Sequence, residues 1–142
     1  ESLSCSDCLN PIANPVENTV FTISVFDQNG CEASANILLK IDKTRKIYIP
    51  NSFSPNGDGS NDVFLIYSDS KSVSKINRFQ IFDRWGGKVF ETFDKLPNNP
   101  DFGWDGTVGG RTMNPSVLIY VAEIEFVDGA RILYKGDLTI LE

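Results

Sequence analysis

Histidine is absent from this 142-residue chain, and its absence argues against much of the usual catalytic and metal-binding chemistry. Histidine is the most frequent general base in enzymes and the most frequent metal ligand in proteins. The sequence also contains neither the G-x-S-x-G motif of serine hydrolases nor a cysteine–histidine pair. We therefore expect no catalytic residues and predict that the protein is not an enzyme.

Clusters of basic residues and long apolar runs are missing as well. The chain has 13 basic and 19 acidic side chains, which gives a net charge of −6. Because an acidic surface repels phosphate backbones, nucleic acid is not an expected partner. The longest apolar run, VLIYVA, is much shorter than the roughly 20 residues of a membrane helix, so we do not expect the chain to span a membrane.

Alternating and β-branched segments separated by turn residues fill most of the chain, and no segment has a sustained helical period. This pattern predicts an all-β fold, an antiparallel immunoglobulin-like β-sandwich preceded by a partial or small β-sandwich repeat. The predicted strands are residues 20–27, 33–42, 47–50, 62–67, 76–83, 88–93, 117–127 and 131–142. Residues 68–75 are polar and are expected to be irregular.

The charged segment DKTRK has no apolar residue and marks a domain boundary. We place a first domain at residues 1–42, a linker at 43–46 and a second domain at 47–142. No signal peptide opens the chain, and its first residues already lie in a patterned segment, so we expect it to be the tail of a longer protein.

In residues 117–127, strand alternation puts one consistently apolar set of side chains on a single face, which we expect to point inward. That set is Tyr120, Ala122, Ile124 and Phe126. Leu138 and Ile140 are the corresponding core candidates of the last predicted strand.

The three cysteines precede the boundary, and a structural disulfide in an exported protein is the favoured interpretation. A local Cys5–Cys8 bond, with Cys31 unpaired or paired to an upstream residue, is one arrangement. Cys8–Cys31 is the rival pairing, and three reduced cysteines are the third possibility. Zinc would need a fourth ligand, and no further Cys or His is present to supply it.

The stretch SPNGDGSND partly matches a calcium-binding loop, with oxygen side chains at Asn56, Asp58 and Asp62. Two positions depart from that pattern. Ser54 stands where the first acidic ligand belongs, and Leu65 stands where the closing glutamate belongs. These departures favour the alternative, a turn in which the Asn and Asp side chains bond to the local backbone. Calcium is therefore the one possible cofactor, with these three residues as its candidate ligands.

Two tryptophans lie beside glycines in turn-like segments, RWGG and WDG. We expect both Trp85 and Trp104 to be buried in the core, since tryptophan is usually well buried. The alternative for Trp85 is an exposed recognition surface formed with Arg84. Asp105 is expected to cap a turn before Gly106.

The order of these pieces resembles one known family. IPNSFSPNGDGSNDVF, FQIFDRWGGKVFE, WDG and YKGDLTIL follow one another in the manner of the gliding-motility-associated C-terminal domain, the type B sorting domain of the type IX secretion system. The resemblance covers residues 47–142. One departure is NPSVLIY, which replaces the Gly-Val-Tyr run of the family but retains Tyr120. Residues 1–42 are similar to the end of an immunoglobulin-like adhesin repeat.

The resemblance implies a secretion and surface-sorting signal of a large adhesin. Its implied partners are the type IX outer-membrane machinery and a dedicated outer-membrane β-barrel protein, and its implied location is the cell surface, attached to the outer membrane. An alternative function is a calcium- or carbohydrate-binding adhesive module that acts directly at the surface. The motif residues expected to take part in partner recognition are Phe53, Pro55, Asn56, Gly57, Asp58, Gly59, Asn61, Asp62, Arg84, Trp85, Gly86, Trp104, Asp105 and Gly106.

Overall fold

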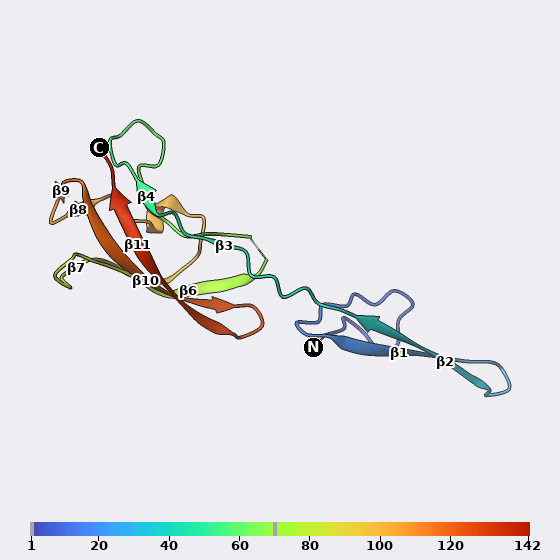
Figure 1. Cartoon of the computed structure of the whole chain (residues 1–142). Coiled ribbons are helices and arrows are strands. Elements are labelled where there is room, and N and C mark those ends of the chain that lie inside the picture. The colour runs from blue at the N-terminus through green and yellow to red at the C-terminus, as the bar shows by residue number, and fades with distance from the viewer. Residues whose placement is uncertain (1, 70) are drawn as a thin grey trace. The chain divides into compact units, whose positions relative to one another are not determined.

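The computed structural model describes residues 2–69 and 71–142 and is built almost entirely of β-strands and turns (Figure 1). The predicted all-β class is confirmed. Within the described part of the chain there is no α-helix, and a single 3-10 turn spans Pro100–Phe102. The chain divides into two compact units, Glu1–Lys43 and Thr44–Glu142.

The first unit contains one antiparallel pair, β1 (Thr19–Phe26) and β2 (Glu32–Leu39). One face of this ribbon is apolar in three successive cross-strand pairs: Phe21 with Ile37, Ile23 with Ala35, and Val25 with Ala33. The opposite face is more polar, and there Thr22 donates to the side chain of Asn36 at 2.8 Å. Ile23 and Val25 are 52% and 60% exposed, so the apolar face is largely uncovered in this unit.

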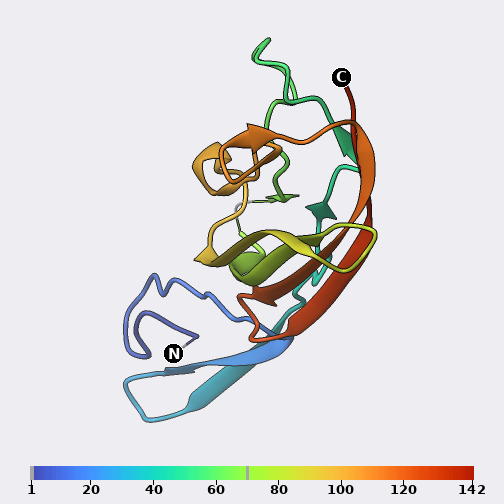
Figure 2. The same ribbon diagram turned by 90° about the vertical axis from the view of Figure 1, so that its left-hand side faces the viewer.

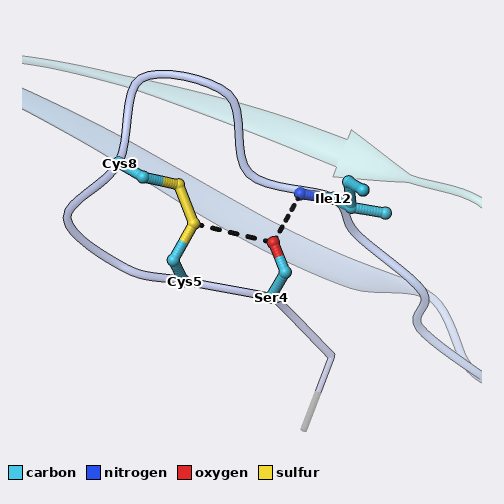
Figure 3. The surroundings of a disulfide bond; sticks show 4 residues. All are labelled: Ser4, Cys5, Cys8 and Ile12. Atoms are coloured by element: carbon cyan, nitrogen blue, oxygen red, sulfur yellow. Dashed lines mark hydrogen bonds between the residues drawn. A yellow bond between two sulfur atoms is a disulfide. The ribbon is translucent and has the colours of Figure 1, made fainter.

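A disulfide joins Cys5 and Cys8, whose α-carbons lie 5.9 Å apart, and the local pairing is thereby confirmed over the Cys8–Cys31 alternative (Figure 3). Beside it, the backbone N–H of Ile12 donates to the hydroxyl of Ser4 at 2.9 Å. Cys31 has a free, exposed thiol at the end of the β1–β2 turn.

The second unit is organised around one mixed sheet with the strand order β4-β11-β10-β6-β7. Its strands are β4 (Ser52–Phe53), β6 (Val73–Phe82), β7 (Lys88–Lys95), β10 (Ser116–Phe126) and β11 (Arg131–Ile140). The three long pairings are antiparallel, as predicted. The short β4–β11 pairing is parallel, because the chain runs along the edge of β11 in the same direction for two residues.

Short strand pairs and connecting segments cover the inner face of this sheet and complete a two-layered β-sandwich (Figure 2). The pairs are β3 (Ile47–Tyr48) with β5 (Tyr67–Ser68), and β8 (Thr107–Val108) with β9 (Arg111–Thr112). The side chains of β10 and β11 that were predicted to point inward do so. Ala122, Ile124, Phe126, Leu138 and Ile140 are all buried, and Tyr120 is half-buried against them.

Two strand predictions need correction. Residues 62–67 do not form one continuous strand: Phe64 makes a single isolated β-bridge, and a two-residue strand begins only at Tyr67–Ser68. Phe64, Leu65 and Ile66 are buried one after another, so this stretch fills the core between layers instead of alternating across a sheet. β6 begins at Val73, inside the segment expected to be irregular, because the Val73 side chain is itself part of the core.

Candidate recognition site

Residues 54–62, the stretch SPNGDGSND, form a closed surface loop that follows β4, and we call it the signature loop. The Ser54 N–H donates to the carbonyl of Asn61 at 3.0 Å and so closes the loop at its base. Gly57, Gly59 and Asn61 have positive φ angles of 78°, 85° and 56°. Glycine adopts this conformation without strain, and Asn tolerates it better than most residues, which explains these residue types in the loop. Figures 1 and 2 both show the loop projecting beside the end of β11.

The Asp62 carboxylate holds the loop together from within. One oxygen accepts the N–H of Gly57 and the other accepts the N–H of Gly59, both at 2.7 Å. Asn56 and Asp58 each accept the backbone N–H two residues further on, at 3.1 and 2.8 Å. Short bonds to an ionised acceptor are among the stronger protein hydrogen bonds. Side-chain oxygens and backbone amides therefore satisfy one another, as the turn interpretation predicts.

The same contacts argue against calcium in this conformation. A Ca²⁺ ion takes six to eight oxygen ligands. Both Asp62 oxygens receive amide hydrogens, so one lone pair of each is already directed at a backbone N–H and not at a cation. The side-chain oxygen of Asn56 and one oxygen of Asp58 likewise accept backbone N–H groups. The three candidate ligands do not fit a calcium ion as they stand.

The loop is attached to the interior through aromatic side chains on both flanks. Phe53 and Phe64 are 3% and 0% exposed, and their ring centroids lie 5.8 Å apart. Trp104 is 2% exposed, lies 5.6 Å from Phe53, and forms an isolated β-bridge with Phe64 through two backbone hydrogen bonds of 2.8 and 2.9 Å. The prediction that Trp104 is a core residue is confirmed.

The WDG motif has three distinct local roles. The Trp104 indole N–H donates to the carbonyl of Thr107 at 2.9 Å. Asp105 accepts from the Thr107 N–H at 3.0 Å, so the predicted turn cap is confirmed. Gly106 has φ of +77°, and a β-carbon there would lie 2.8 Å from the Pro55 ring. Glycine is thus required at this position both by backbone conformation and by contact with the loop.

The RWGG motif lies at the tip of the β6–β7 hairpin. Gly86 donates its N–H to the Asp83 carbonyl at 3.0 Å and has φ of +81°. The Asp83 carboxylate accepts from the N–H groups of Trp85 and Gly87 at 2.9 and 2.7 Å. The prediction that Trp85 is buried is wrong, because its side chain is 82% exposed. A hairpin tip projects beyond the sheet, and no described segment packs over it; only the Arg84 guanidinium stacks on the indole, at 4.9 Å.

The tertiary structure thus brings together residues of two motifs that lie about fifty positions apart in the sequence. Pro55 and Phe53 meet Gly106 and Trp104, whereas the contacts of Arg84 remain within its own hairpin. The motif residues on the surface are Asn56, Gly57, Asp58, Gly59, Asn61, Arg84, Trp85, Gly86 and Asp105. Sequence reasoning did not identify the Asp83 carboxylate, although an Asp two residues before a turn amide is a known signal for this contact.

The family model that describes the type IX secretion signal domain, CHU_C, matches residues 47–140, well over half of the chain. The chain belongs to this family. No curated protein matches it. The matched residues cover the mixed sheet, the signature loop, the RWGG hairpin and the WDG motif. The signal domain therefore corresponds to nearly all of the second structural unit, Thr44–Glu142. A domain of this family is a sorting signal that directs export to the cell surface or extracellular space by the type IX machinery.

Residues 47–69 and 71–140 of the signal domain contain short and long β-strands, turns and the 3-10 turn already described. Among residues 2–69 and 71–142, no helix has the length and apolar character that a membrane crossing requires.

Proposed function

We propose that the signal domain sorts a large gliding-motility-type adhesin to the cell surface, where the protein stays attached to the outer membrane. The observation that carries this proposal is the family match over residues 47–140. The proposed partners are the outer-membrane components of the type IX machinery and a dedicated outer-membrane β-barrel protein. Recognition needs no catalysis in this proposal, because shape and surface chemistry of a folded domain are enough to select a partner.

The signature loop and the RWGG hairpin supply the proposed recognition surface. Binding is weakened when mobile groups must be ordered, so a loop that is already fixed loses less free energy on association. The carboxylates of Asp62 and Asp83 each accept two backbone N–H groups and hold these segments in one shape. The buried members of the motif set, Phe53, Trp104 and Gly106, would act by positioning the loop and would not touch a partner.

We also propose that residues 1–42 are the C-terminal part of an immunoglobulin-like adhesin repeat, joined by the linker 43–46 to the signal domain. An isolated two-stranded ribbon is only marginally stable in water. The β1–β2 ribbon has one apolar face, which is the pattern of a strand pair that packs on an opposing sheet. Further strands of such a repeat would cover Ile23, Val25 and Ile37, which are now exposed.

An export assay tests the sorting function. A neutral periplasmic protein carrying residues 43–142 is produced in a bacterium with the type IX system and in the same strain without it. Release to the surface or the medium only in the first strain supports the proposal. A matched passenger carries Leu138→Asp, which places a charge at a fully buried position and should prevent export by unfolding the signal. Glycan or calcium binding by an unexported passenger would instead support the adhesive-module alternative.

A further inference from the structure

Within the described part of the chain, three hairpins use the same turn. In each, the first residue of a five-residue segment donates its N–H to the carbonyl of the fifth at 2.8–3.0 Å, and a glycine in fourth place has φ of 80–83°. This is the pattern of three-residue hairpin loops. The segments are Asp27–Cys31, Asp83–Gly87 and Phe126–Ala130.

The three hairpins differ in the residue at the third position of the turn. Asn29 and Asp128 hold it in two of them, and both are residue types that such turns favour. Trp85 holds it in the β6–β7 hairpin and is 82% exposed. The first and second turns are alike in detail, since Asp27 and Asp83 both accept from the third and fifth backbone N–H groups. The turn forms equally well without an indole, so turn geometry gives no reason for tryptophan here.

Arg84, next to Trp85, also differs from other arginines of the chain. Its guanidinium stacks on the Trp85 ring at 4.9 Å, and among the described residues no carboxylate pairs with it. By comparison, Arg45 and Arg131 are both paired with carboxylates, at 2.7 and 2.9 Å. A stacked guanidinium keeps its in-plane N–H donors available at the ring edge. The hairpin tip therefore presents a flat apolar surface with solvent-exposed N–H donors beside it.

We propose that Trp85 and Arg84 form the anchor with which the signal domain binds the export machinery. The indole enters an apolar pocket of a protein partner, and the guanidinium pairs with a carboxylate at the pocket rim. This inference rests on the proposed sorting function. Tryptophan and arginine are the residue types most enriched among the side chains that dominate binding energy in protein interfaces. A protein pocket suits the tip better than an anionic lipid surface, which would repel a chain of net charge −6.

The chain itself supplies a turn-preserving test variant. Arg84→Gln with Trp85→Asn copies the Gln28–Asn29 pair of the β1–β2 turn into the β6–β7 hairpin and leaves Asp83 and Gly86 in place. The matched control is Val127→Asn, which removes an apolar side chain, 53% exposed, from the tip of the third hairpin. Both variants are made in the full 142-residue chain fused behind a reporter, and their thermal unfolding is compared with that of the parent.

The expected result is a fall in reporter export of about tenfold or more for the double variant, with unfolding temperature unchanged and Val127→Asn exported normally. Arg84→Glu is expected to impair export more than Arg84→Gln, because it places like charges at the pocket rim. Normal export of the double variant would contradict the proposal that Trp85 and Arg84 form the anchor. Equal effects of Arg84→Gln and Arg84→Glu would contradict the proposed pairing of Arg84 with a carboxylate of the partner. If the parent is not exported at all, the sorting function fails, which is a distinguishable outcome.

Tryptophan fluorescence gives a second readout on the full chain. Acrylamide reaches Trp85 but not Trp104, which is 2% exposed, so quenching reports mainly on the hairpin tip. Outer-membrane vesicles from type IX-competent cells should protect Trp85 from quenching. Vesicles from cells without the machinery, and vesicles of extracted lipid alone, should not. Protection by lipid alone would overturn the proposal in favour of a membrane contact, and absence of protection by all three would overturn it outright.

Discussion

The ring of Tyr120 lies directly over the α-carbon of Gly136, its partner across the β10–β11 ladder. A β-carbon built on Gly136 would lie 2.8 Å from the Tyr120 hydroxyl oxygen and 2.9 Å from Cε1 and Cζ. The ring also meets Phe64, with centroids 5.8 Å apart. Because Gly136 has no side chain, β11 leaves room for the Tyr120 ring, which packs the sheet against Phe64, just after the signature loop.

Gly136→Ala should destabilise the signal domain. The new methyl group must displace the Tyr120 ring from its place, and overpacking of this kind costs about 1–3 kcal/mol. Urea denaturation followed by circular dichroism measures the change. Lys135→Ala, at the exposed neighbouring position, is the control and should stay within about 0.5 kcal/mol of the parent. Equal stabilities of the two variants would show that the ring relaxes freely.

Replacement by phenylalanine should lower the stability of the domain at Trp104 but leave it nearly unchanged at Trp85. Trp104→Phe removes the indole N–H bond to the Thr107 carbonyl and leaves a gap in the aromatic cluster, with an expected cost of about 2–4 kcal/mol. Trp85→Phe should change stability by less than about 0.5 kcal/mol, because the side chain is exposed. Thermal unfolding of both variants makes the comparison. A large loss for Trp85→Phe would mean that the tip supports the fold.

Asp62→Asn should loosen the signature loop without unfolding the domain. An amide side chain has one oxygen and one NH2 group, so in this variant a donor would face one of the two N–H groups that the Asp62 oxygens now accept. Hydrogen exchange at these two amides is expected to accelerate by about tenfold, while β10 remains protected. Addition of calcium to the parent should leave both the exchange rates and the unfolding temperature unchanged. A calcium-induced rise in unfolding temperature would contradict the turn interpretation.

Arg45 ties the beginning of the second unit to the β10–β11 hairpin. Its guanidinium pairs with Asp128 at 2.7 Å and lies 4.8 Å from the centroid of the Phe126 ring. Arg45→Ala should cost about 1–2 kcal/mol, since both contacts are partly shielded from water. Arg45→Lys should recover only part of this loss, because an ammonium group cannot stack as the planar guanidinium does. Urea midpoints of the two variants distinguish a charge effect from a stacking effect.

Stability should fall on acidification below about pH 4.5, because two carboxylates have a lower pKa in the folded than in the unfolded state. The pKa of Asp69 is held below its usual 3.8 by hydrogen bonds from the Ser72 hydroxyl and backbone N–H. The pKa of Glu91 lies below 4.5 because the side chains of Lys88 and Gln80 donate to it. Both groups favour the folded state above their unfolded pKa values, and this contribution is lost as the pH falls through the lowered folded values.

A carboxyl titration by NMR checks the cause of the Asp69 shift. Ser72→Ala removes the hydroxyl donor, so the pKa of Asp69 should rise towards 3.8, whereas that of Glu91 should not move. An unchanged Asp69 value in this variant would assign the lowered pKa to some other group.

Residue patterns alone were enough to predict the fold class and the strands that form the long antiparallel ladders. The alternation in residues 117–127 correctly directed Ala122, Ile124 and Phe126 inward, because side chains of a strand must alternate between faces. The order of short motifs was enough to predict the family for residues 47–142, and the family model matches residues 47–140. The CSDC spacing allowed the local disulfide but left two other states open, because only spatial proximity selects among them.

The burial of the turn residues, in contrast, depends on long-range packing. Trp85 and Trp104 both stand beside glycines, yet one is 82% and the other 2% exposed. Local spacing cannot separate them, because burial of a turn residue depends on which distant segment packs over it. Phe53 and Phe64 cover Trp104, whereas the β6–β7 hairpin carries Trp85 beyond the sheet edge into solvent. Long-range packing, and not residue type, therefore made one tryptophan part of the core and left the other available on the surface.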